Sequence, residues 1–197
     1  MTSLRITGDA LWARMERAVE KVHERLRKAA GALEQAGIPY AVVGGNAVRI
    51  WVSQVDEAAV RNTRDVDILV RREDLDRIRE VLESTGFVFR RSAGVTMFLD
   101  NELAKARDSV HLVFCQEMVR DDDPEPNPDV EPFEYGESFR TLPLETLVRM
   151  KLNAHRLKDR VHLLDMISVG LVDASWLTRY PDPLRSRLQD LLENPNQ

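Results

Sequence analysis

The sequence predicts an α/β (α+β) fold in which helices flank a mixed β-sheet and a C-terminal helical annex follows. Two observations support this prediction. Short β-rich runs alternate with segments of helical periodicity over residues 1–140, whereas from Pro143 onward the apolar residues recur at helical spacings. We therefore expect a sheet-containing core over residues 1–140, which includes a long N-terminal helix, and a helical annex over residues 141–197 that packs on the core.

The first predicted element is a long helix from Asp9 to Ala36. Its apolar residues recur every three or four positions and form one stripe, made of Leu11, Met15, Val19, Val22, Leu26, Ala29 and Leu33. Gly37 and Pro39 are typical helix terminators and set its end. The stripe indicates that this helix packs against the core.

A strand, a glycine turn and a second helix come next. Tyr40 to Val43 is rich in β-forming residues and runs into Gly44-Gly45. The segment from Asn46 to Trp51 suits a helix, and the Asn46 side chain is of a type that caps helices.

The rest of the core is predicted as further strands, one helix and a loop. The strands are Val66 to Val70, Phe87 to Phe89, Val95 to Leu99 and Val110 to Cys115, and the helix is Glu73 to Thr85, ended by Gly86. Arg120 to Glu134 combines an acidic run with several prolines and is predicted to be a surface loop. Its consecutive aspartates Asp121, Asp122 and Asp123 could bind a cation, but successive side chains diverge, which favours a plain loop.

The predicted annex consists of helical stretches only. They lie around Leu144 to His155, Val161 to Val169, Trp176-Leu177 and Leu184 to Leu192.

Composition limits the class of function. The 197 residues are 43% apolar and carry 28 Lys and Arg against 33 Asp and Glu, a net charge of -5, which argues against an extended nucleic-acid surface. The single cysteine, Cys115, cannot form an internal disulfide, and no long uncharged apolar run predicts a membrane span. Residues Met1 to Arg5 contain no apolar leader segment, so we expect a cytoplasmic protein.

Two carboxylates form the first candidate site. Asp65 and Asp67 are two residues apart on a predicted strand, and alternation places both side chains on one face, about 7 Å apart at the backbone. Oxygen ligands in this arrangement suit Mg²⁺ or Mn²⁺. Two acids alone would fit a solvated strand end better than a metal site.

The glycine turn strengthens the interpretation. Gly44 and Gly45 lie between a strand and a helix, where backbone amides can approach a phosphate and the helix N-terminus favours negative charge. A nucleoside triphosphate needs both a metal site and a phosphate-binding turn. Arg49, Arg61 and Arg64 lie near in sequence, either as phosphate partners or as counter-charges for the acids.

These motifs resemble those of the DNA polymerase beta-like nucleotidyltransferase superfamily. The resemblance is carried by Val42-Val43-Gly44-Gly45-Asn46-Ala47 and by Arg61-Asn62-Thr63-Arg64-Asp65-Val66-Asp67-Ile68-Leu69-Val70. The segment from Leu147 to Asp159 is similar to a helix in the small bacterial branch that includes the type IV abortive-infection toxins, so a toxin–antitoxin role is an expectation. The resemblance runs from about Tyr40 to Leu177.

The resemblance implies a function and site roles. Asp65 and Asp67 would be catalytic and hold Mg²⁺ or Mn²⁺. Nucleotide binding would involve Gly44, Gly45 and Lys151. Asn46, Arg49 and Arg64, which lie close to these motifs in the sequence, are further candidates for nucleotide binding. The reaction would be attack of an unidentified acceptor hydroxyl on the α-phosphate of an NTP, with pyrophosphate leaving.

The sequence departs from the superfamily at one position. A third carboxylate is expected on a later strand, where Val110-His111-Leu112 has His111, while Asp108 lies three residues earlier with opposite parity. His111 could replace the acid or simply pack in the core. We expect His155 and His162 on the annex to be packing or surface residues rather than zinc ligands.

Three functions are compatible with these residues. The first is a nucleotidyltransferase acting with an NTP on an unidentified acceptor. The second is a catalytically idle nucleotide-binding or antitoxin-type interaction module of the same fold. The third is an aminoglycoside-type transferase with an acidic acceptor pocket, which only the Asp121 to Glu134 loop favours.

Overall fold

The computed structural model of the chain describes residues 8–105, 108–136 and 138–195. Residues Met1 to Arg5, considered above for a leader segment, lie outside the described residues. The helices of the core are α1 (Gly8–Gln35), α2 (Gly44–Ser53) and α3 (Leu75–Ser84), and those after the sheet are α4 (Leu144–Ala154), α5 (Leu157–Ser168) and α6 (Leu184–Glu193). Short 3-10 helices cover Glu57–Ala59, Arg72–Asp74 and Ala174–Arg179.

The strands form one mixed sheet, as the sequence predicts. They are β1 (Tyr40–Val43), β2 (Val66–Val70), β3 (Val88–Ser92), β4 (Val95–Leu99), β5 (Ser109–Phe114), β6 (Glu134–Gly136) and β7 (Phe139–Thr141). Their order across the sheet is β3-β4-β5-β2-β1-β7-β6. The β2–β5 and β1–β7 pairs are parallel, and the other neighbouring strands are antiparallel. Strand β2, which carries the candidate acids, therefore lies in the middle of the sheet.

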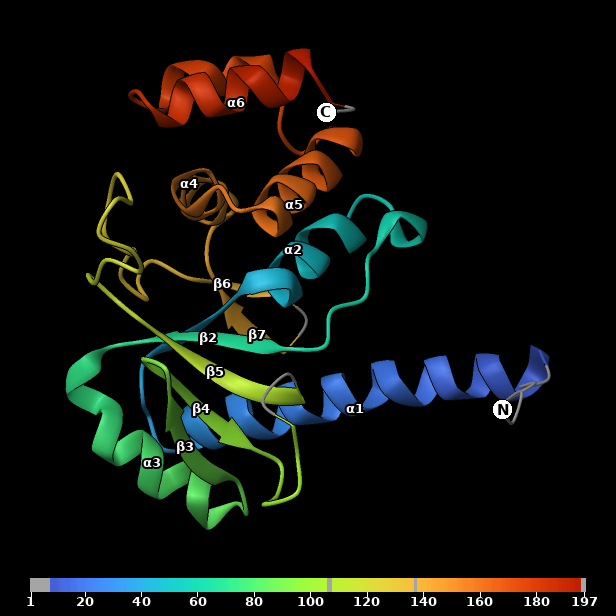
Figure 1. The fold of residues 1–197 in the computed structure, drawn as a ribbon, viewed down its shortest axis with the longest axis vertical. Coiled ribbons are helices and arrows are strands. Elements are labelled where there is room, and N and C mark those ends of the chain that lie inside the picture. Colours follow the sequence, from blue (N-terminus) through green and yellow to red (C-terminus); the bar gives the residue numbers. More distant parts are fainter. Residues whose placement is uncertain (1–7, 106–107, 137, 196–197) are drawn as a thin grey trace.

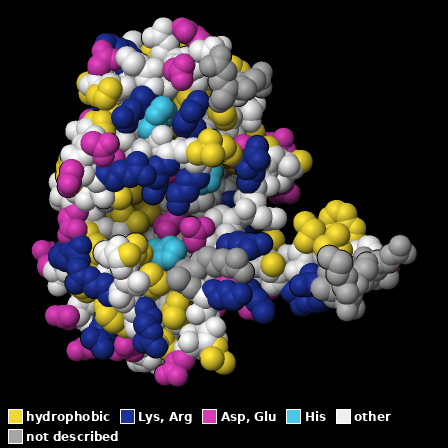
Figure 2. All heavy atoms as spheres, viewed as in Figure 1, with side chains coloured by type: hydrophobic (Ala, Val, Ile, Leu, Met, Phe, Trp, Pro, Cys, Tyr) yellow, Lys and Arg dark blue, Asp and Glu magenta, His cyan; other side chains and the backbone are white. Residues whose placement is uncertain are grey.

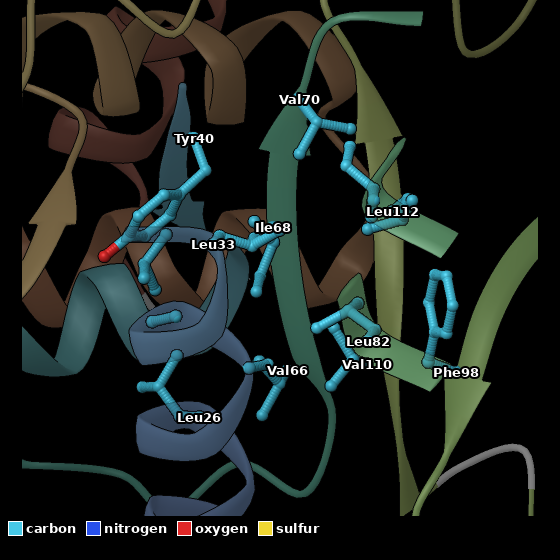
Figure 3. Packing of buried hydrophobic residues seen from close by; sticks show 14 of the residues in the cluster. Leu26, Leu33, Tyr40, Val66, Ile68, Val70, Leu82, Phe98, Val110 and Leu112 are labelled. Atoms are coloured by element: carbon cyan, nitrogen blue, oxygen red, sulfur yellow. The ribbon is translucent and has the colours of Figure 1, made fainter. Parts of the chain in front are cut away.

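One face of the sheet packs against α1 and α3 (Figure 1). Leu26 and Leu33 of α1 face Val66 and Ile68 of β2 in this core (Figure 3). Leu33 and Ile68 are fully buried, so this face supplies much of the apolar burial that stabilises the fold. The N-terminal part of α1 extends beyond the sheet (Figure 1).

The other face packs against α2 and the C-terminal helices in the region of β1 and β2 (Figure 1). Ala41 and Val43 of β1 join a second apolar cluster with Leu152 of α4, Leu163 of α5 and Leu188 of α6. The helices after the sheet are thus held on the edge of the cleft described below. In the part of the chain that the structure describes, no helix has an apolar run long enough to cross a bilayer.

Three local predictions differ from the structure. Helix α2 begins at Gly44 with Val43 as its N-cap, so the prediction that Asn46 caps it is wrong; the Asn46 side chain instead donates to the Asp65 carbonyl, 2.9 Å away. Strands β6 and β7 are absent from the prediction. Part of the segment predicted to begin α3 is a 3-10 turn over Arg72–Asp74.

Candidate active site

The glycine turn lies directly beside the second acid. Val43 pairs with Asp67 across the antiparallel β1–β2 ladder, so the chain turns into α2 at the level of that carboxylate. Gly44 has a φ of +69°, and a Cβ there would overlap the Asp67 carboxylate. A Cβ on Gly45 would lie 2.9 Å from the Thr63 Cβ. Both glycines are therefore required by the close approach of the turn to the acidic segment.

The two acids are held by local hydrogen bonds. Asp65 precedes β2, its carboxylate accepts from the Thr63 hydroxyl at 2.8 Å, and its carbonyl accepts from Asn46. Asp67 lies within β2 with a side chain that is 16% exposed. Thr63 of the preceding loop and Asn46 of α2 thus hold Asp65 from two sides.

His111 occupies the neighbouring strand at the level of Asp67. The parallel register pairs Asp67 with His111, and the His111 Nδ1 lies 3.5 Å from Asp67 Oδ1. The other ring nitrogen lies 3.0 Å from the Ser109 hydroxyl. Asp108 precedes β5, and strand alternation gives it the parity opposite to His111.

Burial and charge act in opposite directions on Asp67. Burial disfavours its charged form, but the hydrogen bond with His111 and the positive charges of Lys158 and Lys151 outweigh burial. The pKa of Asp67 therefore lies below its usual value, and the carboxylate is ionised at neutral pH.

The cluster fits a divalent cation. Asp65, Asp67 and His111 each offer a ligand atom, and these atoms lie within 4.8 Å of one another. Two carboxylate oxygens are the donors that Mg²⁺ and Mn²⁺ prefer, and an imidazole is a less typical addition for Mg²⁺. The acids are thus the main candidates to hold the ion.

A cleft of about 290 Å³ opens between the glycine turn and the α4–α5 region. Gly44, Gly45, Asp65, Asp67 and Lys151 all line it, so the structure brings together five sequence-predicted site residues. We call this space the glycine-turn cleft. On the face drawn in Figure 2, acidic side chains and a histidine are exposed near the middle, with lysine and arginine side chains on both sides.

The buried carboxylate of Asp159 pairs with two basic side chains at this cleft. Asp159 is 0% exposed and accepts from Lys151 Nζ at 3.1 Å and from Arg156 Nε at 2.6 Å. Burial opposes ionisation of Asp159, but Arg156 and Lys151 outweigh it and lower its pKa. Burial is also the main reason that the pKa of Lys151 is lowered, which the charges of Asp159 and Asp67 only partly offset. Lys158, which is exposed, lines the same cleft.

Of the other residues named from the sequence, Asn46, Arg49 and Arg64 do not line the glycine-turn cleft. Asn46 supports Asp65 from within α2 and does not line the glycine-turn cleft. Arg49 lines a small neighbouring hollow rather than the cleft. Arg64 is exposed, and its carbonyl accepts from Arg25. Arg61 does line the cleft, while its side chain pairs with Asp165 at 2.7 Å.

Sequence reasoning named Lys151 but not its partners Arg156 and Asp159 as site residues. The signal that could have found them is the segment Arg156-Leu157-Lys158-Asp159 itself, since an acid three residues after the start of a helix is typical of a capping box. At the start of α5 the Asp159 carboxylate accepts from the backbone N–H of Arg156 at 3.3 Å and from its guanidinium Nε at 2.6 Å, which is the acidic half of such a box; the arginine side chain has only donors and cannot supply the other half.

Comparisons with known proteins bear on the family and the fold of this chain. A family model described as "Uncharacterised nucleotidyltransferase" matches residues 10–193. No curated protein sequence matches the chain.

Solved structures of similar fold come from several proteins. An antigenic nucleotidyltransferase-like protein from Paracoccidioides brasiliensis is 18% identical with a TM-score of 0.58, covering 90% of this chain and 89% of that one. JHP933 from Helicobacter pylori is 14% identical with a TM-score of 0.50, covering 92% and 76%. The antibiotic-resistance factor ANT(2'')-Ia is 14% identical with a TM-score of 0.48, covering 84% and 94%. Since the family model spans nearly the whole sequence, this chain belongs to that family of uncharacterised nucleotidyltransferases.

Proposed function

We propose that this protein transfers a nucleoside monophosphate from an NTP to an acceptor hydroxyl, with Mg²⁺ or Mn²⁺ held by Asp65 and Asp67. The observation that supports this most is the contact between the Gly44 turn and the Asp67 carboxylate inside one cleft. A phosphate-binding turn and a cation site that meet in this way serve one triphosphate.

The proposed step forms one bond and breaks one. The acceptor oxygen attacks the α-phosphorus, the bond from that phosphorus to the bridging oxygen breaks, and pyrophosphate leaves with the electron pair. The hydroxyl proton passes to solvent or to a basic group. A divalent cation bound at the acids supplies charge stabilisation for the entering and leaving oxygens.

The chain's own residues position the donor. The backbone amides of Gly44 and Gly45 at the start of α2 are available to the phosphates. Lys151 and Arg156, fixed by Asp159, and the exposed Lys158 add positive charge along the same cleft. Charge that is fixed in position before the reaction usually makes the largest single contribution to stabilising the transition state. His111 would orient Asp67 through their contact.

One observation favours the alternative function. The strand position expected to carry a third carboxylate holds His111, which is compatible with a catalytically idle nucleotide-binding or antitoxin-type module. Both functions predict NTP binding, and only the enzyme releases pyrophosphate.

The acidic loop gives little support to an aminoglycoside-type acceptor. Glu125 pairs with Arg149 at 2.7 Å and Asp129 pairs with Arg71 at 3.0 Å. Glu125 and Asp129 are therefore paired with neighbouring arginines rather than open to a cationic acceptor, whereas Asp123 of the same loop lines the glycine-turn cleft. The relation to the abortive-infection toxin branch and the cytoplasmic location stay predictions from the sequence.

The test is a transfer assay on the purified chain. Each NTP, labelled at the α-phosphate, is incubated with Mg²⁺ or Mn²⁺, and pyrophosphate release and self-labelling are measured. We expect release that disappears in Asp65→Asn and Asp67→Asn and persists in Asp56→Asn, which changes an exposed acid at the N-cap of η1 (Glu57–Ala59). NTP binding without pyrophosphate release under any acceptor would instead support the idle module.

A further inference from the structure

Two hollows meet at the candidate acids, and both are also lined by Val113, Val119, Asn127, Arg156 and Lys158. The glycine-turn cleft lies on the β1 side of β2, and a larger hollow of about 970 Å³ lies on the β5 side. Asp65 and Asp67 line both, whereas Gly44, Gly45 and Lys151 line only the smaller one. A second molecule in the larger hollow would thus reach the acids from the side away from the glycine turn. We call this hollow the β3–β5 cleft.

The strand register sets one row of side chains across its floor. Asp67 pairs with His111, His111 with Met97, and Met97 with Arg90. Side chains that are directly paired point to the same face of a sheet, and neighbouring strands lie about 4.8 Å apart. Arg90 on β3 is therefore three strands, or about 14 Å, from Asp67 at the backbone.

The middle of the β3–β5 cleft is apolar. Met97, Leu99 and Val113 line it, and the exposed side chains of Val95 and Val119 lie at its rim. Helices α1 and α3 pack on the opposite face of the sheet. The cleft therefore offers an apolar surface between the acids at one end and Arg90 at the other.

The basic side chains that line the β3–β5 cleft differ in whether they are already paired with an acidic side chain. Arg72 is held by Glu117 at 2.6 Å and stacks on Phe114, and Arg156 is held by Asp159. Within residues 8–105, 108–136 and 138–195, Arg91 and Lys158 form no ion pair.

Arg90 is also open to a ligand. It is exposed, and its side chain donates to the carbonyl of Phe89, a neutral group. Arg90 thus places a positive charge at the end of the cleft far from the acids. Arg91 also lines the cleft, although strand alternation starts its side chain on the opposite face of the edge strand β3.

We propose that the β3–β5 cleft is the acceptor subsite and takes a phosphate-bearing acceptor, whose hydroxyl lies at Asp67 and whose phosphate lies at Arg90 and Arg91. This inference rests on the proposed function. The guanidinium groups suit a phosphate, and the apolar floor suits the body of the acceptor between its two ends. A polycationic acceptor is disfavoured because it would meet positive charge at the far rim.

The test compares two double variants of the full-length chain. Arg90→Ala/Arg91→Ala removes the rim charges, and Arg14→Ala/Arg17→Ala removes two exposed arginines from α1, away from the cleft. Each protein is titrated calorimetrically, with and without NTP, against four probes. These are a ribotrinucleotide with a free 3′-hydroxyl, glucose 6-phosphate, an unphosphorylated nucleoside and a polyamino sugar.

We expect the ribotrinucleotide, glucose 6-phosphate or both to bind the parent chain, and their Kd to rise about tenfold or more in Arg90→Ala/Arg91→Ala. The α1 variant should keep the parent values, and NTP affinity should be unchanged in both. Preference for either phosphate probe supports the proposal and identifies the source of the phosphate.

Three outcomes overturn the inference. They are no binding of either phosphate probe to the parent chain, equal binding of the phosphate probes to Arg90→Ala/Arg91→Ala, and tighter binding of the polyamino sugar. Failure of the proposed function is a separate result, since it appears as absent NTP binding or turnover while the phosphate probes still bind through Arg90 and Arg91.

Discussion

Replacement of Gly44 by alanine tests the contact on which the proposed site depends. Gly44 has a φ of +69°, and its missing Cβ leaves room for the Asp67 carboxylate. A left-handed backbone costs an alanine about 1–2 kcal/mol, and overpacking costs about 1–3 kcal/mol more. Reduced freedom of the unfolded chain returns about 0.4–1 kcal/mol. We expect Gly44→Ala to lower the free energy of unfolding by about 2–4 kcal/mol.

Gly37→Ala is the matched control. Gly37 has a similar φ of +63°, but nothing lies within 4 Å of the Cβ it would gain. Gly37→Ala should therefore lower the free energy of unfolding only by the backbone contribution, about 1 kcal/mol. Urea denaturation of both variants at pH 7 measures the difference between them.

A double-mutant cycle separates overlap from backbone strain. Asp67→Ala removes the carboxylate that the new Cβ would meet, so Gly44→Ala should cost less in that background. Equal costs of Gly44→Ala and Gly37→Ala, or an equal cost of Gly44→Ala with and without the Asp67 carboxylate, would refute the close contact between turn and acid.

Three further predictions concern neighbouring residues. Asp159→Asn should lower the free energy of unfolding, measured by urea denaturation, by about 3 kcal/mol or more, because Lys151 would be left buried without its carboxylate. A loss no larger than that of Asp76→Asn, which changes an exposed acid, would contradict this. Burial lowers the pKa of His162 to about 4, and its Nδ1 has no hydrogen-bond partner among the described residues. Its neutral form therefore stabilises the fold above pH 6.5, and this contribution, about 1–2 kcal/mol after solvent screening, should be lost as the pH falls from 6.5 to 4. The stability difference between the parent chain and His162→Gln should shrink over that range, and a constant difference would disprove the prediction. His111→Asp should add a third carboxylate beside Asp67 and raise the Mn²⁺ stoichiometry measured by titration, whereas unchanged stoichiometry would show that this position does not face the ion site.

The fold was largely predictable because its main elements carry strong local patterns. The stripe of α1 and the apolar runs of β1, β2 and β4 give their bounds to within a residue or two. Strands β6 and β7 have three residues each and follow a proline-rich loop, so they lack a pattern of their own and depend on pairing with each other and with β1. Asn46 has the residue type of a helix cap, but Gly44 already starts the helix by adopting a positive φ.

The candidate site was predictable where the alternation of side chains along a strand determines which residues share a face. Asp65 and Asp67 share a face, and the glycine turn follows the neighbouring strand. Arg49 and Arg64 are near in sequence but lie outside the glycine-turn cleft, because closeness along the chain does not fix the direction of a side chain. The pairing of Asp159 with Lys151 joins two helices across a tight bend and is visible only once α4 and α5 are packed.

Asp65 and Asp67 are proposed to hold the cation of a bound nucleotide, and this can be measured by calorimetric titration with NTP in the presence and absence of Mg²⁺. The parent chain should bind NTP at least tenfold more tightly with Mg²⁺, and Asp65→Asn and Asp67→Asn should lose that Mg²⁺ dependence while keeping the parent circular dichroism spectrum. Asp56→Asn should behave as the parent chain. Equal Mg²⁺-dependent affinity in the parent chain and in both variants would show that Asp65 and Asp67 do not hold the cation.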